Sequence, residues 1–313
     1  MKKYEKKKHI PVLLQEVVQS LNIKKNGIYI DGTFGCGGHS NEILKKIGEK
    51  GKLYAIDVDP FAVQEAKKIT DSRFKFFHGS FSNIIFLLRK ENIIKKVDGI
   101  LLDLGVSSIQ LNNPERGFSF RLDGPLDMRM NPTSGITASK WLLENKEKKI
   151  SDVLKKFGEE KYAKKIANAI IKTNKISPIT RTTELSDLIK KNTPFNKSKH
   201  PARCSFQAIR IYLNQELTEL KKILNDSLKI LSHKGRLSII SFHSLEDRIV
   251  KKFFINHSKQ HFFIPKNLPI TENQIKKIKK NNFKIISRIF PNINEIIKNR
   301  RSRSAILRVA ERI

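Results

Sequence analysis

Ile28-Tyr-Ile-Asp-Gly-Thr-Phe-Gly-Cys-Gly-Gly-His-Ser40 is the stretch that decides the fold. An apolar run ends in the carboxylate of Asp31, a turn with four glycines follows, and an amphipathic segment continues over Asn41–Ile47. Glycines let the backbone adopt positive φ and let a ligand lie against the main chain. The start of a helix adds free N–H groups. The pattern predicts strand, glycine-rich turn and helix, the first unit of a nucleotide-type α/β domain.

The spacing of these glycines argues against a dinucleotide. A hydride-transfer enzyme would carry G-x-G-x-x-G. Here Gly35 and Gly37 fit the first two positions, but Ser40 stands at the third. The order of Asp31, Thr33 and the two glycines instead resembles the first motif of class I S-adenosylmethionine (SAM) methyltransferases. An NAD(P)-dependent oxidoreductase is therefore disfavoured.

The next predicted strand, residues 52–57, also ends in a carboxylate. Asp57 follows Gly37 by 20 residues, where a carboxylate can accept hydrogen bonds from both ribose hydroxyls of an adenosyl group. The alternative is a turn or cap aspartate, and the strand context favours the ligand role. Asp59, just before Pro60, is expected to cap the following helix.

Two further strands, Phe74–Phe77 and Val97–Leu102, lead to Phe81 and Asp103. Phe81 could pack against an adenine face, although an aromatic residue at a strand end is more often part of a core. Ligands of open α/β sheets bind at the carboxyl ends of strands. Both residues fall at such ends, as do the two strand-end aspartates named above, so we expect a shared ligand site there.

Length and composition limit the class of protein. The chain has 313 residues, enough for one large or two ordinary domains. Cys36 and Cys204 give neither a disulfide framework nor zinc spacing, and no metal site is expected. No apolar run approaches a membrane span, and the Lys-rich N-terminus lacks an apolar signal core. We expect a soluble, cytoplasmic protein.

The chain carries 62 Lys and Arg against 30 Asp and Glu, a formal net charge of +32. Such an excess favours a polyanionic partner, usually nucleic acid. The alternative is an AT-biased genome, which would enrich Lys, Asn and Ile together whatever the partner. Arginine is less exposed to that bias. Arginines cluster after Asp103 (Arg116, Arg121 and Arg129) and near the C-terminus (Arg300, Arg301, Arg303 and Arg308).

The alternation of strand and helix stops after Asp103 and returns near the C-terminal third. Residues 107–132 are irregular, and apolar residues then recur at helical spacing over 137–192. The α/β pattern then resumes with a long helix over Phe206–Leu231, a buried strand over 235–242, and strands over Phe283–Ile289 and Ser304–Val309. We predict a discontinuous α/β domain, residues 1–133 and 202–313, with a helical insert over 134–201.

These motifs together resemble one family, the bacterial small-subunit rRNA cytosine-N4 methyltransferases. The match runs in order over nearly the full length and includes His9-Ile-Pro-Val-Leu-Leu-Gln-Glu16 and Ser241-Phe-His-Ser-Leu-Glu-Asp-Arg-Ile-Val-Lys251. The other matching segments are 31–40, 55–60, 103–110, 116–120, 124–130, 206–214 and 301–308. One departure is that Asn299 is followed by Arg300 where the family usually has Asn-Pro-Arg, which alters a loop and no cofactor group.

The resemblance implies a Rossmann-like class I methyltransferase sheet with an inserted, mostly helical domain that recognises RNA. It implies methylation of N4 of a cytosine in the decoding centre of 16S rRNA, with the small ribosomal subunit as partner. A homodimer is a further expectation that does not come from the resemblance. The resemblance also implies SAM contacts at Gly37, Gly38, His39, Asp57, Phe81, Asp103 and Gln110.

The chemistry of an exocyclic amine suggests what the site must supply. The cytosine amine is a weak nucleophile, so it has to be held in line with the methyl group and offered hydrogen-bond acceptors. Asp103 is the best-placed acceptor, and its alternative role is a cofactor contact alone. Methylation at C5 would instead need a cysteine nucleophile. Cys36 lies in the cofactor turn and no Pro-Cys pair occurs, which argues against C5.

The remaining candidates carry open alternatives. His39 is expected to contact the methionine end of SAM and not to act as a general base. His243 and Glu246 could bind the RNA backbone or base, or a Ser-x-x-Glu/Asp capping box could open a helix from Ser244. Arg300, Arg301 and Arg303 are expected to bind the RNA backbone, or else to decorate a sheet edge. The main alternative function is a SAM-binding, RNA-binding ribosome assembly factor without turnover.

Overall fold

The computed structural model describes residues 11–194, 200–258 and 282–313. Contacts divide the chain into two compact units. The sheet unit comprises the chain up to Gly105 and from Thr218 onward, and the helical unit comprises Val106–Leu217. A discontinuous domain interrupted by a helical segment is therefore present, with bounds that differ from those predicted.

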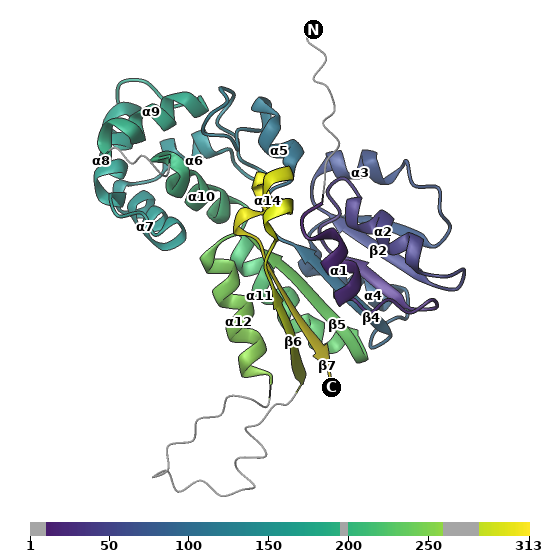
Figure 1. Ribbon diagram of the computed structural model, residues 1–313. Helices are drawn as coiled ribbons and strands as arrows, with labels where there is room; N and C mark the ends of the chain where they lie inside the picture. The colour runs from purple at the N-terminus through teal and green to yellow at the C-terminus, as the bar shows by residue number, and fades with distance from the viewer. Residues whose placement is uncertain (1–10, 195–199, 259–281) are drawn as a thin grey trace, which may run out of the picture. The chain divides into compact units, whose positions relative to one another are not determined.

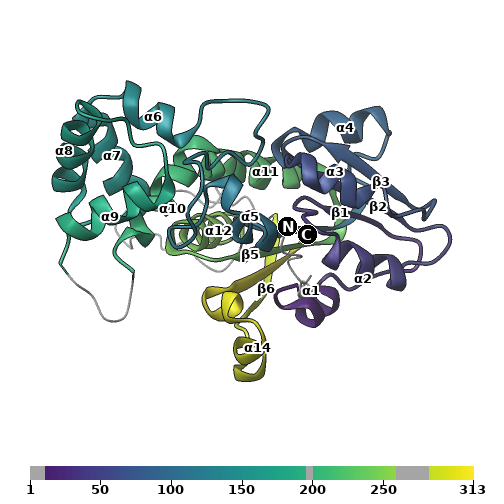
Figure 2. The same ribbon diagram turned by 90° about the horizontal axis from the view of Figure 1, so that it is seen from above.

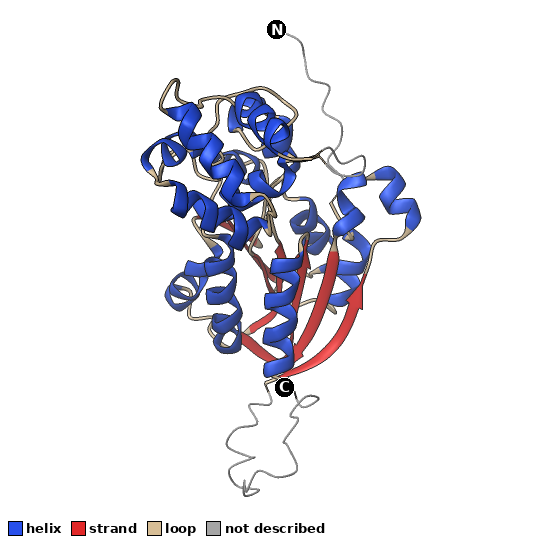
Figure 3. Cartoon of the chain, turned by 90° about the vertical axis from the view of Figure 1, so that its left-hand side faces the viewer, coloured by secondary structure: helices blue, strands red, loops and turns tan. Residues whose placement is uncertain are grey.

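The sheet unit contains a seven-stranded sheet in the order β3-β2-β1-β4-β5-β7-β6, counted over the described residues (Figures 1 and 3). The strands are β1 (Ile28–Asp31), β2 (Lys52–Asp57), β3 (Phe74–His78), β4 (Val97–Asp103), β5 (Leu231–Ser241), β6 (Phe283–Ile289) and β7 (Ile306–Arg312). The first five are parallel, and β7 is antiparallel to both neighbours. The order reverses between β1 and β4, and ligands of open α/β sheets bind at the carboxyl ends of the strands at such a reversal. The predicted Rossmann-like class I methyltransferase sheet is confirmed.

Helices cover both faces of this sheet because its central strands are apolar on both sides. On β4, Ile100 and Leu102 face one core and Leu101 faces the other. Figure 2 shows α1 and α2 on one side of the sheet, and α4 and α11 on the other. The helical elements of this unit are α1 (Leu14–Ser20), α2 (Gly38–Lys46), α3 (Pro60–Ala66), η1 (Phe81–Asn83), α4 (Ile84–Lys90), α11 (Glu216–Ile230), α12 (Ser244–Asn256), α14 (Ile293–Lys298) and η3 (Arg300–Ser304). The boundary between the units falls in the first turn of α11, before Thr218.

The predicted long helix over Phe206–Leu231 is wrong, because the chain forms two helices there. α10 (Ala202–Leu213) ends at Asn214, and Gln215 has a left-handed φ of 51° before α11 begins. The Asn214 amide holds the break: its Nδ2 donates to the carbonyls of Met128 and Arg210, each at 2.8 Å. A side chain that bonds backbone in this way competes with helix continuation.

The C-terminal strand also differs from its prediction. β7 begins at Ile306, and the preceding arginines lie on the 3₁₀ turn η3. Asn299 caps that turn, because its Oδ1 accepts from the Arg301 amide at 3.2 Å. β7 lies between β5 and β6, so β6 occupies the sheet edge and the arginines do not precede an edge strand. Arg308 of this cluster forms a bidentate pair with Asp247 of α12, at 2.7 and 3.0 Å.

The helical unit has its own apolar core and is wider than the predicted insert of residues 134–201. Phe118, Leu126 and Met128 precede that insert, and Phe206 and Ile209 follow it, yet all five side chains pack in the same core. The irregular segment and α10 therefore belong with the helices. The other elements are α5 (Ser108–Asn112), η2 (Pro114–Arg116), α6 (Ala138–Glu144), α7 (Glu147–Gly158), α8 (Ala163–Asn174) and α9 (Thr182–Asn192).

Two arginines of the cluster after Asp103 have structural partners inside this unit. Arg129 pairs with Asp127, with Nη2 and Oδ2 2.7 Å apart. Arg116 donates from Nη2 to the carbonyl of Met130 at 2.8 Å. These side chains fasten the irregular segment to itself, so part of the arginine clustering is explained by folding.

Candidate active site

The glycine-rich turn joins β1 to α2 and needs glycine at defined positions. Gly35 and Gly37 have φ of 55° and 75°, in the left-handed region that favours glycine. A Cβ on Gly37 would lie 2.7 Å from the Phe34 ring, and one on Gly38 would lie 2.3 Å from Cγ of Pro11. A Cβ on Gly35 would meet no atom within 4 Å among the described residues. The turn is thus packed against Phe34 and Pro11 at Gly37 and Gly38, and it is open at Gly35, where a ligand can approach the main chain.

Asp31, at the end of β1, has a structural role in this turn. Its side chain is buried, and Oδ2 accepts from the Ser40 hydroxyl at 2.7 Å while Oδ1 accepts from the Thr33 amide at 3.1 Å. Burial raises the pKa of Asp31 to about 6, although the two hydrogen bonds favour the ionised form and lower the pKa. The carboxylate therefore ties the end of β1 to the first turn of α2 and shapes the site without facing it.

Asp57, at the end of β2, is fixed by two backbone amides. Oδ2 accepts from Gly35 at 2.7 Å and Oδ1 from Asp59 at 2.9 Å. Each carboxylate oxygen has a second lone pair, so Asp57 keeps the capacity to bind ribose hydroxyls. Burial raises its pKa to about 6. The predicted capping role of Asp59 is confirmed, because its Oδ1 accepts from the Phe61 amide at 3.0 Å with Pro60 at the first helical position.

Asp103, at the end of β4, carries a polar atom that lacks a partner. Its amide donates to the Thr33 hydroxyl at 2.6 Å, which positions the residue. Its Oδ1 is buried and accepts no hydrogen bond from any described residue. Burial raises the pKa of Asp103 to about 8, and the charges of Asp31 and Glu246 add to the effect. A buried acceptor with a raised pKa favours a ligand that brings a donor or a positive charge.

His39 is held rigidly in the first turn of α2. The side chain is buried, and Nε2 lies 3.0 Å from the Val12 carbonyl, so Nε2 carries the hydrogen. Burial lowers the pKa of the imidazole to about 4, which keeps it neutral at pH 7. Nδ1 lies 3.8 Å from Oδ2 of Asp103. A neutral, buried ring suits positioning and is a poor general base near neutrality.

Phe81 lies beside the end of β1 because Gly32 has no side chain. A Cβ on Gly32 would be 3.4 Å from Cβ of Phe81 and 2.5 Å from Cδ2 of Leu102. Phe81 begins η1 after Ser80, whose hydroxyl accepts from the Ser82 amide. The ring is half-buried and packs partly on the core. An aromatic face next to the glycine turn can take an adenine ring, as the sequence predicts.

Gln110 belongs to the helical unit and closes the N-terminus of α5. Its Oε1 accepts from the Ser107 amide at 2.9 Å, and the Ser107 hydroxyl accepts from the Gln110 amide at 3.2 Å. This reciprocal pair is a capping box. The structure thus gives Gln110 a local role, and its expected SAM contact remains a prediction.

His243 follows β5 and begins α12. Its Nδ1 accepts from the Glu246 amide at 3.4 Å, and Glu246 Oε2 accepts from the Phe242 amide at 2.9 Å. His243 Nε2 and Glu246 Oε1 are 3.1 Å apart. A capping arrangement therefore exists, one residue earlier than the alternative from Ser244. By contrast, Arg300, Arg301 and Arg303 are exposed on η3.

Sequence reasoning missed three parts of this site. It assigned no role to Pro11 and Val12, which pack on Gly38 and bond His39, although they lie in a quoted segment. It used Thr33 only as a spacing marker, yet this hydroxyl positions Asp103. It named Glu246 as a candidate for RNA binding or capping, and the charge of Glu246 also raises the pKa of Asp103.

A sheet of this order, with a glycine turn after β1 and carboxylates ending β2 and β4, defines a class I SAM-dependent methyltransferase. The family model of the MraW methylase family matches residues 6–313, and the chain belongs to this family. It is 58% identical to "Ribosomal RNA small subunit methyltransferase H" of Buchnera aphidicola subsp. Acyrthosiphon pisum (strain Tuc7), over 97% of each chain. Proteins of the same name from Buchnera aphidicola subsp. Cinara cedri (strain Cc) and Buchnera aphidicola subsp. Baizongia pistaciae (strain Bp) are 59% and 56% identical to this chain. They align with 97% of this chain and with 99% and 97% of their own lengths.

The residues present fit SAM. The cofactor carries two positive charges, a sulfonium and an amino group. The buried Oδ1 of Asp103, which has no partner among the described residues, can accept a hydrogen bond from the amino group. The open space at Gly35 adjoins Asp57, which can bind ribose hydroxyls. Among the described residues, no helix is both long and apolar enough to cross a membrane.

Proposed function

We propose that this protein transfers the methyl group of SAM to the N4 amine of a cytosine in the decoding centre of 16S rRNA, in the cytoplasm. The single observation that carries the proposal is the buried, unpartnered Oδ1 of Asp103 at the carboxyl end of β4. Support for the RNA substrate comes from relatives named ribosomal RNA small subunit methyltransferase H, at 56–59% identity.

Bound SAM supplies an electrophilic methyl group on a sulfonium. The chain's own task is to bind and orient the two reactants. Asp57 binds the ribose hydroxyls, the half-buried ring of Phe81 packs on the adenine, and the backbone of Gly37 and Gly38 holds the methionine end. Because Asp57 is fixed by two amides, it reaches this geometry without further ordering, which favours tight binding.

Asp103 acts as a contact to the positive end of the cofactor in this proposal. Burial and two neighbouring carboxylates raise its pKa to about 8, so a cation is the partner that best stabilises its ionised form. The cytosine amine is neutral and offers less of that stabilisation. A direct bond from Asp103 to the amine is the second candidate role, and kinetics at saturating SAM separate the two.

No general base is needed in this scheme. The methylated amine is acidic enough to release its proton to water, and the neutral His39 stays bonded to the Val12 carbonyl. His39 therefore keeps α2 and the segment before α1 together while the reactants bind.

Recognition of the RNA is assigned to the helical unit and to the exposed Arg300, Arg301 and Arg303. The net charge of +32 is consistent with an RNA partner. A homodimer is also part of the proposal. Size-exclusion chromatography with light scattering tests it, and a monomeric mass removes it.

The test compares binding with turnover. Calorimetry should show SAM binding and no NAD binding. Small ribosomal subunits that lack the modification should then accept radiolabelled methyl groups from SAM in 16S rRNA. Binding of SAM and RNA without transfer would instead support the assembly-factor alternative, and NAD binding would refute the cofactor assignment.

A further inference from the structure

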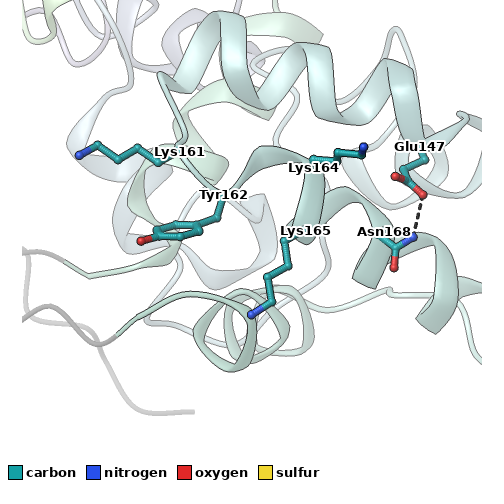
Figure 4. Close-up of a pocket in the computed structure, with 6 residues that line it drawn as sticks. All are labelled: Glu147, Lys161, Tyr162, Lys164, Lys165 and Asn168. Atoms are coloured by element: carbon teal, nitrogen blue, oxygen red, sulfur yellow. Dashed lines mark hydrogen bonds between the residues drawn. The ribbon is translucent and has the colours of Figure 1, made fainter.

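The helical unit contains a recess that belongs to no site described above. It has a volume of about 440 Å³ and lies between the start of α7 and the first half of α8 (Figure 4). Its lining residues are Glu147, Lys161, Tyr162, Lys164, Lys165 and Asn168.

The sequence of α8 explains why these side chains gather. Apolar residues at Ile166, Ala167 and Ile170 pack in the same core as Ile150 and Leu154 of α7. On α8, Lys164 and Lys165 lie four and three residues before Asn168, which places these three polar lining residues on one face of the helix. Lys161 and Tyr162 lie in the turn that precedes α8. One face of α8 thus closes the core while another forms the recess.

The recess carries positive charge that no carboxylate of the described residues pairs with. None of its three lysines forms an ion pair with any described residue, whereas Lys140 and Lys190 elsewhere in the unit pair with Glu144 and Asp187. The one carboxylate, Glu147, accepts from Nδ2 of Asn168 at 2.8 Å through Oε2. The ammonium groups are therefore available to an anionic ligand.

An aromatic ring stands among these charges. Tyr162 is 41% exposed, and Figure 4 shows its ring between Lys161 and Lys165, with Lys164 extending toward Glu147. An exposed ring flanked by cations is the arrangement that binds single-stranded nucleic acid, because the base stacks on the ring and the phosphates meet the cations. The carboxylate of Glu147 can accept from the hydroxyl and amino donors of a nucleotide.

We propose that this recess binds one single-stranded nucleotide of the rRNA substrate. Its base packs against Tyr162, and its phosphates contact Lys161 and Lys165. The inference rests on the proposed function, since it identifies RNA as the ligand, and it adds a specific contact on the helical unit.

The test uses the full chain and compares matched substitutions. Tyr162→Ala removes the ring, Tyr162→Phe keeps it, and Lys165→Gln removes one charge. Lys172→Gln removes an equal charge from an exposed position of the same helix outside the recess. Binding of a fluorescent single-stranded oligoribonucleotide is measured over a range of salt concentrations. SAM affinity and thermal unfolding check that each variant is folded.

We expect Tyr162→Ala to weaken RNA binding by about 5- to 150-fold, the range that base stacking gives, and Tyr162→Phe to restore it. Lys165→Gln should flatten the slope of log K against log salt by roughly 0.7–0.9, the value for one phosphate contact. Lys172→Gln should keep the wild-type slope. The KM for small subunits should rise in Tyr162→Ala, with kcat unchanged.

Equal behaviour of Lys165→Gln and Lys172→Gln, or wild-type affinity in Tyr162→Ala, overturns the proposal, as does absence of RNA binding by the wild type. A charge effect seen only with anionic phospholipid vesicles also overturns it. Methyl transfer by the wild type is scored separately. If transfer occurs while the variants match the control, the recess fails and the proposed function stands. If the recess variants lose RNA binding but the wild type transfers no methyl group, the recess proposal stands and the proposed function fails.

Discussion

Replacing Asp103 with Asn should stabilise the cofactor-free protein while it weakens SAM binding. In the unfolded chain this carboxyl titrates near 3.8, and in the folded chain at about 8. The folded state therefore binds the proton more tightly, and stability falls as pH rises from about 4 toward 8. A tenfold change in such an equilibrium is ~1.4 kcal/mol, so at pH 7 the penalty reaches about 4 kcal/mol. Asparagine carries no charge, so the substitution removes this penalty. The smaller cost of burying a polar amide group remains.

The assay is urea unfolding of the cofactor-free wild type and variant at about pH 5 and about pH 8. We expect the variant to gain about 1–4 kcal/mol at the higher pH, and less at the lower pH, where the wild-type carboxyl is protonated. SAM affinity should fall roughly 10- to 150-fold, the equivalent of ~1.5–3 kcal/mol for a hydrogen bond to a charged group.

Asp98→Asn is the matched control on the same strand. Asp98 bonds Lys24 at 2.6 Å and the Ile28 amide at 3.1 Å, so its loss should destabilise the protein slightly and leave SAM binding unchanged. If Asp103→Asn shows no gain in stability at the higher pH, the carboxyl is not held in the unfavourable state described above. If SAM affinity is also unchanged, Asp103 has no role in the site.

Three further outcomes are expected. Asp57→Asn should weaken SAM binding by about 10-fold or more, measured by calorimetry. Asparagine keeps an oxygen that can accept from the Gly35 amide, so we expect the variant to fold. Wild-type SAM affinity in this variant would remove Asp57 from the site. SAM affinity should rise with pH and level off above about 8, because a cation releases the proton of Asp103; titrations in buffers of different ionisation enthalpy should show proton release, and a flat profile would contradict it. Arg301→Ala and Arg303→Ala should each flatten the salt dependence of rRNA binding by roughly 0.7–0.9 and spare SAM affinity, whereas unchanged slopes would move the RNA surface elsewhere.

The parts of the fold that local patterns control were predictable from sequence. Strand ends at Asp57 and Asp103 follow from apolar runs that stop at a carboxylate, and the cap at Asp59 follows from Asp-Pro. The parallel pairing of β1 to β5 follows from the alternation of strands and crossover helices, whereas the order of the strands and the antiparallel β7 come from the structure.

The misplaced elements depend on contacts between residues distant in sequence. The break after α10 depends on Asn214 bonding the carbonyl of Met128, 86 residues earlier, and the helical periodicity does not show it. The helical unit extends beyond its predicted bounds because Phe118 and Phe206 share one core. The structural role of Asp31 became visible only when Ser40 was placed against it. A strand-end aspartate has the same sequence signature whether it faces a ligand or a neighbouring helix.

The most direct test of the central claim is mass spectrometry of 16S rRNA nucleosides from cells with and without this gene. We predict N4-methylcytidine at one decoding-centre cytosine in the presence of the gene, its loss in the deletion strain, and its return when purified protein and SAM are added to small subunits from that strain. An unchanged N4-methylcytidine content, or a loss of 5-methylcytidine instead, would contradict it.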